Sequence, residues 1–500
     1  MKRVYEKFAF YLFLIPLFFV LHGSVENFGL IGIRDCLFLV FVYVAATIFL
    51  YFIFSLLLKN HRKTALITSY SIGFYLFFGA IYDFFKNNNT TLYNYIISIS
   101  LFFILLITGL IYLKRAKKKF ARITLFLNLL LTIFTLTDLA ILTGNLLHNS
   151  NNIHSKNISV NKSAYQPCTN CPKPDIYLLL FDEYASSISL KERFNYNNSG
   201  FDSFLLSRKF HIITNSTSNY DFTPFSMASI LNMSYLPDLN NPKSLTAKEY
   251  AGCDALIQNN EIVKYLSAQG YDFINYSVFD ISDKYSAIEQ TLLPIKTKLI
   301  TSRTLWGYLQ KDMNWVLYAI KVKLKKIAEH VIFKQAEDNE NIILLTEKES
   351  MSLSGKPKFV YAHLYMPHPP YFFDKEEKKR DIKTVTEENN ESSYQSYLNY
   401  LSYTNRKAKE LIDTILSNTN KSAVIIFLSD HGFRHITNIA DRNNFFQNQN
   451  AIYFPDQDYI SLNDSLSAVN EFRVVFNKLF NAQFPLLRDS VIFLENKPKN

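Results

Sequence analysis

Cysteine is scarce in this sequence, with four residues among 500, so the fold does not depend on a dense disulfide framework. Cys168 and Cys171 have half the spacing of a zinc site, but no second ligand pair follows at a suitable distance. Cys36 lies in an apolar stretch that we expect in lipid. We therefore predict a structural disulfide among Cys168, Cys171 and Cys253, with one thiol left over and the pairing open.

Charge is almost absent from five hydrophobic stretches in the first 147 residues: Phe8–Leu21, Cys36–Leu58, Thr64–Tyr82, Thr90–Leu113 and Ile123–Leu147. The last four have about the length that crosses roughly 30 Å of hydrocarbon as a helix. The first is shorter and is either a span or a signal-peptide core. Because no clear cleavage site follows it, we expect a retained span. Residues 1–147 are thus predicted to form a membrane domain of about five helices.

Asp138 is the one acidic residue within a predicted span. A carboxylate inside a membrane is a candidate functional group. It also lies toward the outer half of its helix, where water can reach it, so an ordinary solvated position is the competing interpretation.

Basic residues are distributed unequally between the loops of this domain. One set of loops holds twelve: Lys2, Arg3, Lys7, Lys59, Arg62, Lys63, Lys114, Arg115, Lys117, Lys118, Lys119 and Arg122. The alternate loops hold only Arg34 and Lys86. The positive-inside rule then places the N-terminus in the cytoplasm and everything after Leu147 outside. The abundance of Phe and Asn indicates an AT-rich bacterial genome, so we expect the bacterial cytoplasmic (inner) membrane and an envelope with a periplasm.

The net charge of +10 comes almost entirely from the membrane domain. Residues 1–149 hold 14 of the 53 Lys and Arg and 5 of the 43 Asp and Glu, which leaves 39 against 38 for the remainder. The exported part is near neutral, and a nucleic-acid-binding function is excluded on this ground.

The exported part begins with a polar segment, residues 148–173, that we interpret as a linker. From 174 to about 490, apolar runs typical of buried strands alternate with helical patterns. The strand-like runs are DIYLLLFDEY, FHIITNS, DFINYSVF, KFVYAHLY and AVIIFLSD, and the clearest helical stretch spans 393–416. This alternation predicts an α/β domain with a mostly parallel central sheet covered by helices on both faces. The sequence has no internal repeat.

The segment Asn314–Gln335 places apolar residues among four lysines. Such a basic amphipathic helix either lies on an anionic membrane surface or packs on the domain as an ordinary surface helix.

Chemistry-bearing residues follow the apolar runs of the predicted sheet: Asp182, Glu183, His363, His368, Asp430 and His431. In open α/β sheets, ligands bind beyond the carboxyl ends of the strands. Carboxylates suit Mg or Mn, and imidazole favours Mn or Zn. We therefore predict one divalent metal, Mn or Zn before Mg, with Gly432 letting the chain turn away without crowding it. Taken alone, Glu183 or His363 would be an ordinary strand-end residue.

Thr223 precedes a helix of small residues that also contains Ser226 and Ser229. A hydroxyl at a helix N-terminus is favoured by the helix dipole and lies near unpaired N–H groups. Metal coordination would make it a nucleophile. The alternative is that Thr223 only caps the helix.

The strand ending in FDEY, the later Thr223, PHPP and the SDHG after a late strand together resemble the alkaline phosphatase and sulfatase superfamily. The membrane helices make the chain similar to lipoteichoic acid synthases and phosphoethanolamine transferases. The resemblance implies a catalytic domain over 174–490. It further implies Asp182, Asp430 and His431 as metal ligands, Thr223 as the metal-bound nucleophile, and His368 or His363 at the phosphoryl group.

Two departures from the family pattern matter. A sulfatase needs a Cys or Ser, converted to formylglycine, in a C/S-x-P-x-R frame, and here Phe222 occupies that position with no Arg after it. A two-metal site would need a second cluster of ligands, and only His363, His368 and His435 are obvious contributors to one. We therefore expect one metal. We also expect Arg434 and His435 to contact the substrate.

The leading hypothesis is a phosphotransferase that moves a phosphoryl-alcohol headgroup, of the phosphoethanolamine or phosphoglycerol type, from a membrane phospholipid to an envelope glycan or lipid. One rival is a phosphoric or sulfuric ester hydrolase of the same family. Another is a catalytically silent membrane protein that serves in binding or assembly.

Overall fold

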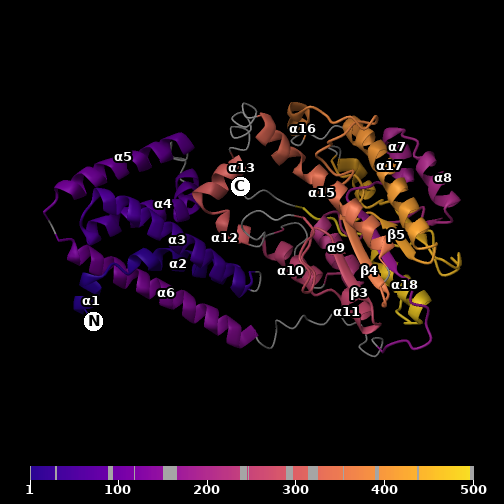
Figure 1. Cartoon of the computed structure of the whole chain (residues 1–500), viewed down its shortest axis with the longest axis horizontal. Coiled ribbons are helices and arrows are strands. Elements are labelled where there is room, and N and C mark those ends of the chain that lie inside the picture. The colour runs from indigo at the N-terminus through magenta and orange to yellow at the C-terminus, as the bar shows by residue number, and fades with distance from the viewer. Residues whose placement is uncertain are drawn as a thin grey trace. The chain divides into compact units, whose positions relative to one another are not determined.

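A computed structural model of the protein describes residues 2–28, 31–87, 94–117, 119–149, 166–236, 245, 247–288, 297–312, 325–352, 354–388, 394–435 and 439–495. The chain forms two compact units. The first comprises Met1–Lys156 with Gln290–Lys323, and the second comprises Asn157–Glu289 with Leu324–Asn500. Figure 1 labels most of their helices and the strands β3, β4 and β5.

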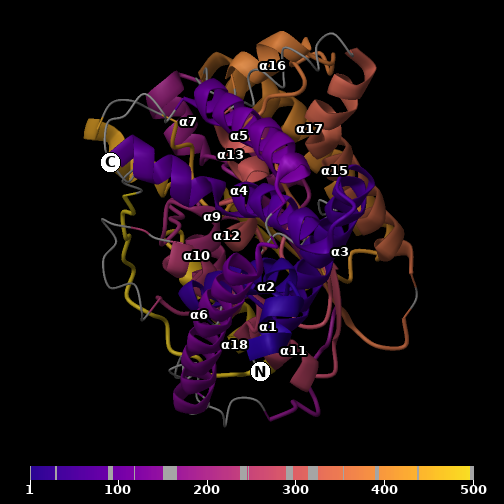
Figure 2. The same ribbon diagram turned by 90° about the vertical axis from the view of Figure 1, so that its left-hand side faces the viewer.

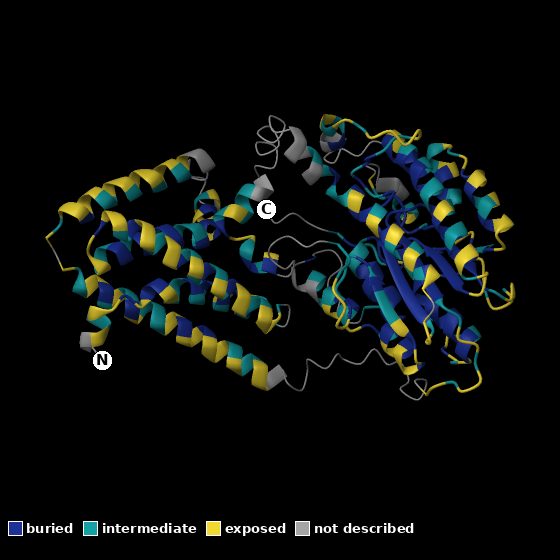
Figure 3. Cartoon of the chain, viewed as in Figure 1, coloured by how far each residue is buried: buried dark blue, intermediate teal, exposed yellow. Residues whose placement is uncertain are grey.

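The first unit is built of helices: α1 (Lys2–Lys7), α2 (Tyr11–Glu26), α3 (Ile33–Leu57), α4 (His61–Asn87), α5 (Tyr95–Arg115), α6 (Ala121–Asn149), α12 (Lys298–Thr301) and α13 (Leu305–Asp312). Among the described residues, α3 to α6 contain four stretches long and apolar enough to cross a membrane. Figure 3 shows that exposed residues run along these helices. Many of them are apolar, such as Phe41 and Leu56, which are 69% and 68% exposed. Such a surface is suited to contact with lipid.

The first hydrophobic stretch forms α2, a helix of 16 residues, which is about 24 Å long at 1.5 Å per residue. It packs against α3, α4 and α6. Asn128 of α6 accepts a hydrogen bond from the Tyr11 N–H (2.8 Å) and donates to the Phe8 carbonyl (2.7 Å). Four of the about five expected spanning helices thus have the length and composition of a span, whereas α2 is a shorter apolar helix whose crossing of the membrane stays a prediction.

The second unit contains a six-stranded sheet in the order β2-β6-β5-β1-β4-β3. Its strands are β1 (Ile176–Phe181), β2 (His211–Ile212), β3 (Asp272–Tyr276), β4 (Lys358–Leu364), β5 (Val424–Leu428) and β6 (Asn450–Tyr453). β1 is parallel to β4 and β5, and β3 is parallel to β4. β6 runs antiparallel to β5 and β2. The prediction of a mostly parallel sheet is confirmed.

Helices cover both faces of this sheet, because alternate strand residues point to opposite sides. Leu178 and Ile426 belong to one buried cluster, with α9 (Thr223–Asn232), α10 (Ala247–Gln258), α11 (Glu261–Ala268) and α18 (Glu471–Phe480). Leu179 and Phe427 belong to the other, with α7 (Ser187–Phe194), α8 (Ser199–Ser207), α15 (Lys325–Met351), α16 (Ile382–Glu388) and α17 (Tyr394–Asn418). Two short 3₁₀ helices are η4 (Ile439–Phe445) and η5 (Ala468–Asn470).

Several sequence expectations can be placed on this fold. The disulfide joins Cys168 to Cys171, and Cys253 is the buried thiol left over. The linker 148–173 falls largely, and residues 314–324 of the amphipathic segment entirely, outside the described residues. The apolar run at 210–216 contributes only the two residues of β2, because the chain turns from Ile213 onward.

Glu471, the first residue of α18, is a fully buried acid outside the strand ends described below. Its Oε2 accepts a hydrogen bond from Asn450 (2.8 Å), while Oε1 has no partner among the described residues. Burial raises the pKa of the Glu471 carboxyl to about 7. As the pH rises from about 4.5 to 7, the unfolded chain releases this proton before the folded chain does, so stability falls by up to about 3 kcal/mol.

Glu471→Gln should remove this loss, because the amide does not ionise. We expect the variant to match the wild-type melting temperature at pH 5 and to exceed it by several degrees at pH 8. Thermal unfolding of the purified full chain at both values measures the effect. Glu410→Gln, at an exposed position of α17, is the control and should show no such trend. Equal melting temperatures for Glu471→Gln and wild type at pH 8 would contradict the prediction.

Candidate active site

The carboxyl ends of three adjacent strands bring the predicted residues together. Leu180 of β1 pairs with His363 of β4 on one side and with Leu428 of β5 on the other. The three strands therefore end at the same edge. Asp182 and Asp430, which follow β1 and β5, are buried there.

Asp182, Asp430 and His431 form the first group of candidate ligands, with one atom of each lying within 4.8 Å of the others. Both carboxylate oxygens of Asp182 and Oδ2 of Asp430 lack a hydrogen-bond partner among the described residues. Buried charged oxygens without partners are costly unless a cation or donor meets them. This group therefore fits a divalent cation, with two carboxylates and one imidazole as donors.

The ring of His431 is held with one nitrogen facing this group. Its Nδ1 lies 2.9 Å from the Gly432 carbonyl oxygen, and because a carbonyl only accepts, Nδ1 carries the proton in this contact. Nε2 is left with a lone pair, 3.3 Å from Oδ2 of Asp430. This tautomer is the one that metal-binding histidines adopt when the second nitrogen is hydrogen-bonded.

Thr223 is the first residue of α9, and its hydroxyl lies 3.4 Å from Nε2 of His431. The N-cap residue is Phe222, and no side chain caps this helix. The capping role considered from the sequence is therefore not observed. The hydroxyls of Ser226 and Ser229 donate instead to the carbonyls of Asp430 (2.6 Å) and Ser234 (2.8 Å). Of these three hydroxyls, that of Thr223 contacts a side chain of the first group, whereas that of Ser226 contacts only the backbone of Asp430.

A second group of candidate ligands consists of Glu183, His368 and His435. Glu183 is fully buried with a φ of 63°, and its Oε1 accepts from the Arg434 N–H (3.0 Å). Its Oε2 lies 3.2 Å from Nε2 of His435 and 3.9 Å from Nε2 of His368. His368 Nδ1 donates to the Pro369 carbonyl (2.6 Å), so in the neutral ring its Nε2 also keeps a lone pair. The expected single metal would occupy the first group, so this second group of candidate ligands was not foreseen from the sequence.

The two histidines of β4 and its following loop, expected to share one task, lie in different places. His363 is buried, with Nε2 3.7 Å from Oδ2 of Asp182 and Nδ1 3.0 Å from the Tyr361 hydroxyl. It therefore adjoins the first group, whereas His368 belongs to the second.

Arg434 connects the second group to the start of α9. Its backbone binds Glu183, while its guanidinium donates to the Asp221 carbonyl (2.8 Å) and lies over the Phe222 ring, 4.5 Å from the centroid. These contacts hold the two residues just before Thr223 in place. That Arg434 also contacts the substrate stays a prediction.

The charges of the two groups act strongly on one another. Burial and the neighbouring Asp182 raise the pKa of Asp430. Burial also raises the pKa values of Asp182 and Glu183, but nearby imidazoles outweigh it, so both pKa values are lowered overall. His368 has the largest lowering effect on Asp182. His435 has the largest lowering effect on Glu183, whose pKa falls to about 2. Neighbouring acids with pKa values shifted in opposite directions are typical of functional sites.

Gly432 lies close to the backbone of a neighbouring segment. A Cβ at this position would lie 2.6 Å from the carbonyl oxygens of Asn444 and Gln447. The glycine therefore makes room for the neighbouring backbone of residues 444–447, while its role beside a bound metal stays a prediction.

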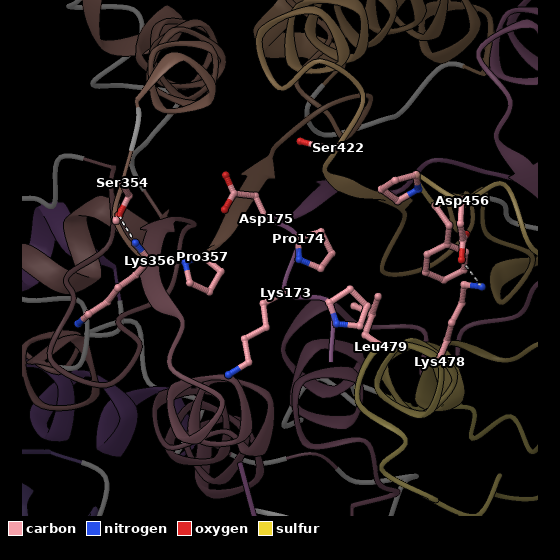
Figure 4. Close-up of a pocket in the computed structure, with 14 residues that line it drawn as sticks. Lys173, Pro174, Asp175, Ser354, Lys356, Pro357, Ser422, Asp456, Lys478 and Leu479 are labelled. Carbon is pink, nitrogen blue, oxygen red and sulfur yellow. Dashed lines mark hydrogen bonds and ion pairs between the residues drawn. The ribbon is translucent and has the colours of Figure 1, made fainter. Parts of the chain in front are cut away.

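A hollow of about 640 Å³ lies at the other end of the strands (Figure 4). Its lining includes Asp175, Pro357 and Ser422, which precede β1, β4 and β5. The residues of the two ligand groups do not line it. Its basic side chains are engaged, as with Lys478, which pairs with Asp456 at 2.9 Å. The candidate ligand groups therefore lie at the carboxyl ends of the strands and not at this hollow.

Comparison with known proteins gives the family. No curated protein matches the sequence. Among solved structures, the chain is similar to the C-terminal periplasmic domain of EcEptC from Escherichia coli, with 10% identity over 67% of this chain and 94% of that one and a TM-score of 0.38. For the corresponding domain of phosphoethanolamine transferase EptC from Campylobacter jejuni, the identity is 15%, the coverage 63% and 92%, and the TM-score 0.34.

The phosphonate monoester hydrolase of Agrobacterium radiobacter is similar at 12% identity, over 61% of this chain and 73% of that one, with a TM-score of 0.37. Identities and TM-scores this low carry no conclusion about the reaction. The family described as Sulfatase, however, matches residues 195–460, which is more than half of the chain. The protein is therefore a membrane enzyme of the sulfatase family, a metal-dependent group within the alkaline phosphatase superfamily.

Proposed function

We propose that this enzyme transfers a phosphoryl-alcohol headgroup from a membrane phospholipid to a hydroxyl of an envelope glycan, through a covalent intermediate on Thr223. The observation that carries the proposal is the Thr223 hydroxyl at the start of α9, 3.4 Å from His431 and beside the buried acids of the first group. Membership of the family does not decide the reaction, and the formylglycine frame of sulfatases is absent from the sequence.

The residues of the first group would hold a divalent cation through Asp182, Asp430, His431 and the Thr223 oxygen. When bound, the cation would lower the pKa of the hydroxyl and attract the phosphoryl oxygens. The N–H groups at the start of α9 favour an anionic phosphodiester in the same place. With both ring nitrogens protonated, His368 and His435 would each donate a hydrogen bond from Nε2 to an oxygen of the transferred group.

The reaction is a double displacement. The Thr223 oxygen forms a bond to phosphorus as the bond to the diacylglycerol oxygen breaks, and an acceptor hydroxyl then forms a bond to phosphorus as the bond to Thr223 breaks. Over both steps, the proton lost by the acceptor hydroxyl equals the proton gained by diacylglycerol. No net oxidation or hydrolysis is involved.

We place this reaction at the outer face of a bacterial inner membrane, with the N-terminus in the cytoplasm and residues 174–490 as the extracytoplasmic catalytic domain. Support comes from the unequal distribution of basic residues between the loops. A membrane-bound enzyme also stays close to a donor that cannot leave the bilayer.

Phospholipid labelled in the headgroup phosphate tests the proposal. Purified enzyme in vesicles, supplied with Mn or Zn and an envelope glycan fraction, should move label to the glycan and release diacylglycerol. Label recovered only as free headgroup phosphate would identify a hydrolase and refute the transferase. If neither product forms, and cells that carry Thr223→Ala and Asp430→Asn keep the wild-type phenotype, a binding or assembly role is supported.

A further inference from the structure

Two short helices in the middle of the exported sequence belong to the membrane unit. α12 and α13 lie between β3 and α15 in sequence, yet the segment Gln290–Lys323 groups with residues 1–156. Figures 1 and 2 both show α12 beside α2 and α13 beside α4, in agreement with the contacts between these elements. The chain therefore returns to the membrane helices after it has left them.

The α12–α13 segment supplies a hydrogen-bond partner at a break in α4. At Phe77 the backbone of α4 departs from helical geometry (φ −97°, ψ 15°). The N–H of Gly79, just after this break, donates to the carbonyl of Arg303 at 2.9 Å. A backbone N–H released by a kink in a membrane helix needs a partner, because lipid supplies none. Here the partner comes from a residue more than 220 positions later in the chain.

Two glycines allow this close approach. A Cβ on Gly79 would lie 2.6 Å from the Arg303 carbonyl oxygen and 2.7 Å from Cε2 of Tyr308, and a Cβ on Gly23 of α2 would lie 2.8 Å from Cγ1 of Ile300. Ile300 is buried in an apolar cluster with Phe19 of α2. The fit is thus a packed surface and not a single contact.

Polar groups at the ends of α2 and α4 extend this surface. Arg303 pairs with Glu26 at 2.6 Å, and the Tyr308 hydroxyl donates to Asp83 at 2.7 Å. Glu26 and Asp83 are two of the five acids in the first 149 residues. Asp138, the acid within a predicted span, lies 3.2 Å from His22, which in turn is 3.8 Å from Glu26. Asp138 therefore belongs to the same chain of polar contacts as Glu26 and Arg303.

We propose that residues 298–308 are a docking element that binds the outer ends of α2 and α4 and so attaches the exported chain to the membrane unit a second time, independently of the linker. Trp306 is 50% exposed on this element, and tryptophan at the end of a membrane helix bundle suits the headgroup layer. We expect this second attachment to limit how far the catalytic domain can move from the membrane surface. This consequence rests on the proposed function, whereas the docking itself does not.

Gly79→Leu tests the docking, because the new side chain would meet backbone and cannot be accommodated by a rotamer change. Gly73→Leu, in the same helix with no atom within 4 Å of its added Cβ, is the matched control. In right-side-out membrane vesicles, chymotrypsin should cut after Trp306 or Tyr308 about tenfold faster in Gly79→Leu than in wild type or Gly73→Leu. Equal cleavage of all three would overturn the proposal.

A charge exchange provides the second test, should Gly79→Leu fail to insert. Glu26→Arg and Arg303→Glu should each increase cleavage, and the double variant should restore wild-type protection. Failure of the double variant to restore protection would count against the docking.

Activity separates this proposal from the proposed function. Turnover of phospholipid in vesicles should fall several-fold in Gly79→Leu, while turnover of the soluble bis(p-nitrophenyl) phosphate should stay at the wild-type value. Equal loss on both substrates would overturn the restricting role. If wild type transfers no headgroup but the cleavage pattern holds, the proposed function fails and the docking stands.

Discussion

Thr223→Ala is expected to abolish the covalent headgroup intermediate and to lower turnover by on the order of 10⁴-fold. We expect this loss because the Thr223 hydroxyl lies 3.4 Å from Nε2 of His431 at the first ligand group. The hydroxyls of Ser226 and Ser229 donate instead to backbone carbonyls. Mass spectrometry of enzyme quenched during turnover measures the intermediate. A phosphoethanolamine or phosphoglycerol increment on the peptide containing Thr223 would also name the donor.

Two variants control for this result. Thr223→Ser keeps a hydroxyl at the same position and should retain the adduct with a moderate loss of rate. Ser226→Ala removes a hydrogen bond to the Asp430 carbonyl (2.6 Å), so it should weaken the fold locally while the adduct on Thr223 persists. An adduct found on Ser226, or undiminished turnover in Thr223→Ala, would show that the nucleophile is wrongly assigned.

The architecture was predictable wherever the chain buries long apolar runs. β1, β4 and β5 are fully buried strands of five to seven residues, and such runs are read directly from composition. β6 was missed because its four residues, Asn450–Tyr453, are too few for a recognisable pattern. The docking of α12 and α13 was missed for another reason, since it depends on bonds such as Gly79 to Arg303 that link distant parts of the chain.

The candidate site was predictable only in part. The rule that ligands bind beyond parallel strands led to Asp182, Asp430 and His431. It could not show that Glu183 belongs to a second group, because the direction of this side chain depends on a backbone φ of 63° and on His435. Two adjacent acids after one strand were the available signal. Likewise, no local pattern separates a capping threonine from a nucleophile.

Asp430→Asn is expected to remove most of the bound metal and to reduce turnover by more than about 10³-fold. The substitution keeps the shape of the side chain but removes one of two buried carboxylate charges that face the cation. Losing a ligand charge from a site with only two acids weakens binding strongly. Metal analysis of the purified enzyme after dialysis against buffer with trace Mn or Zn measures the loss. Glu471→Gln, a buried acid outside both groups, is the control and should retain its metal.

Glu183→Gln then distinguishes the roles of the two groups. The amide oxygen can still accept from the Arg434 N–H, but His368 and His435 lose their anionic neighbour. We expect the first group to keep its cation, because Asp182, Asp430 and His431 are untouched, and turnover to fall about 10²-fold through weaker contact with the phosphoryl group. A wild-type content of two metals per chain that falls to one in Glu183→Gln would identify the second group as a metal site. Loss of all metal in this variant would contradict the separation into two groups, since it would show that they bind a cation together.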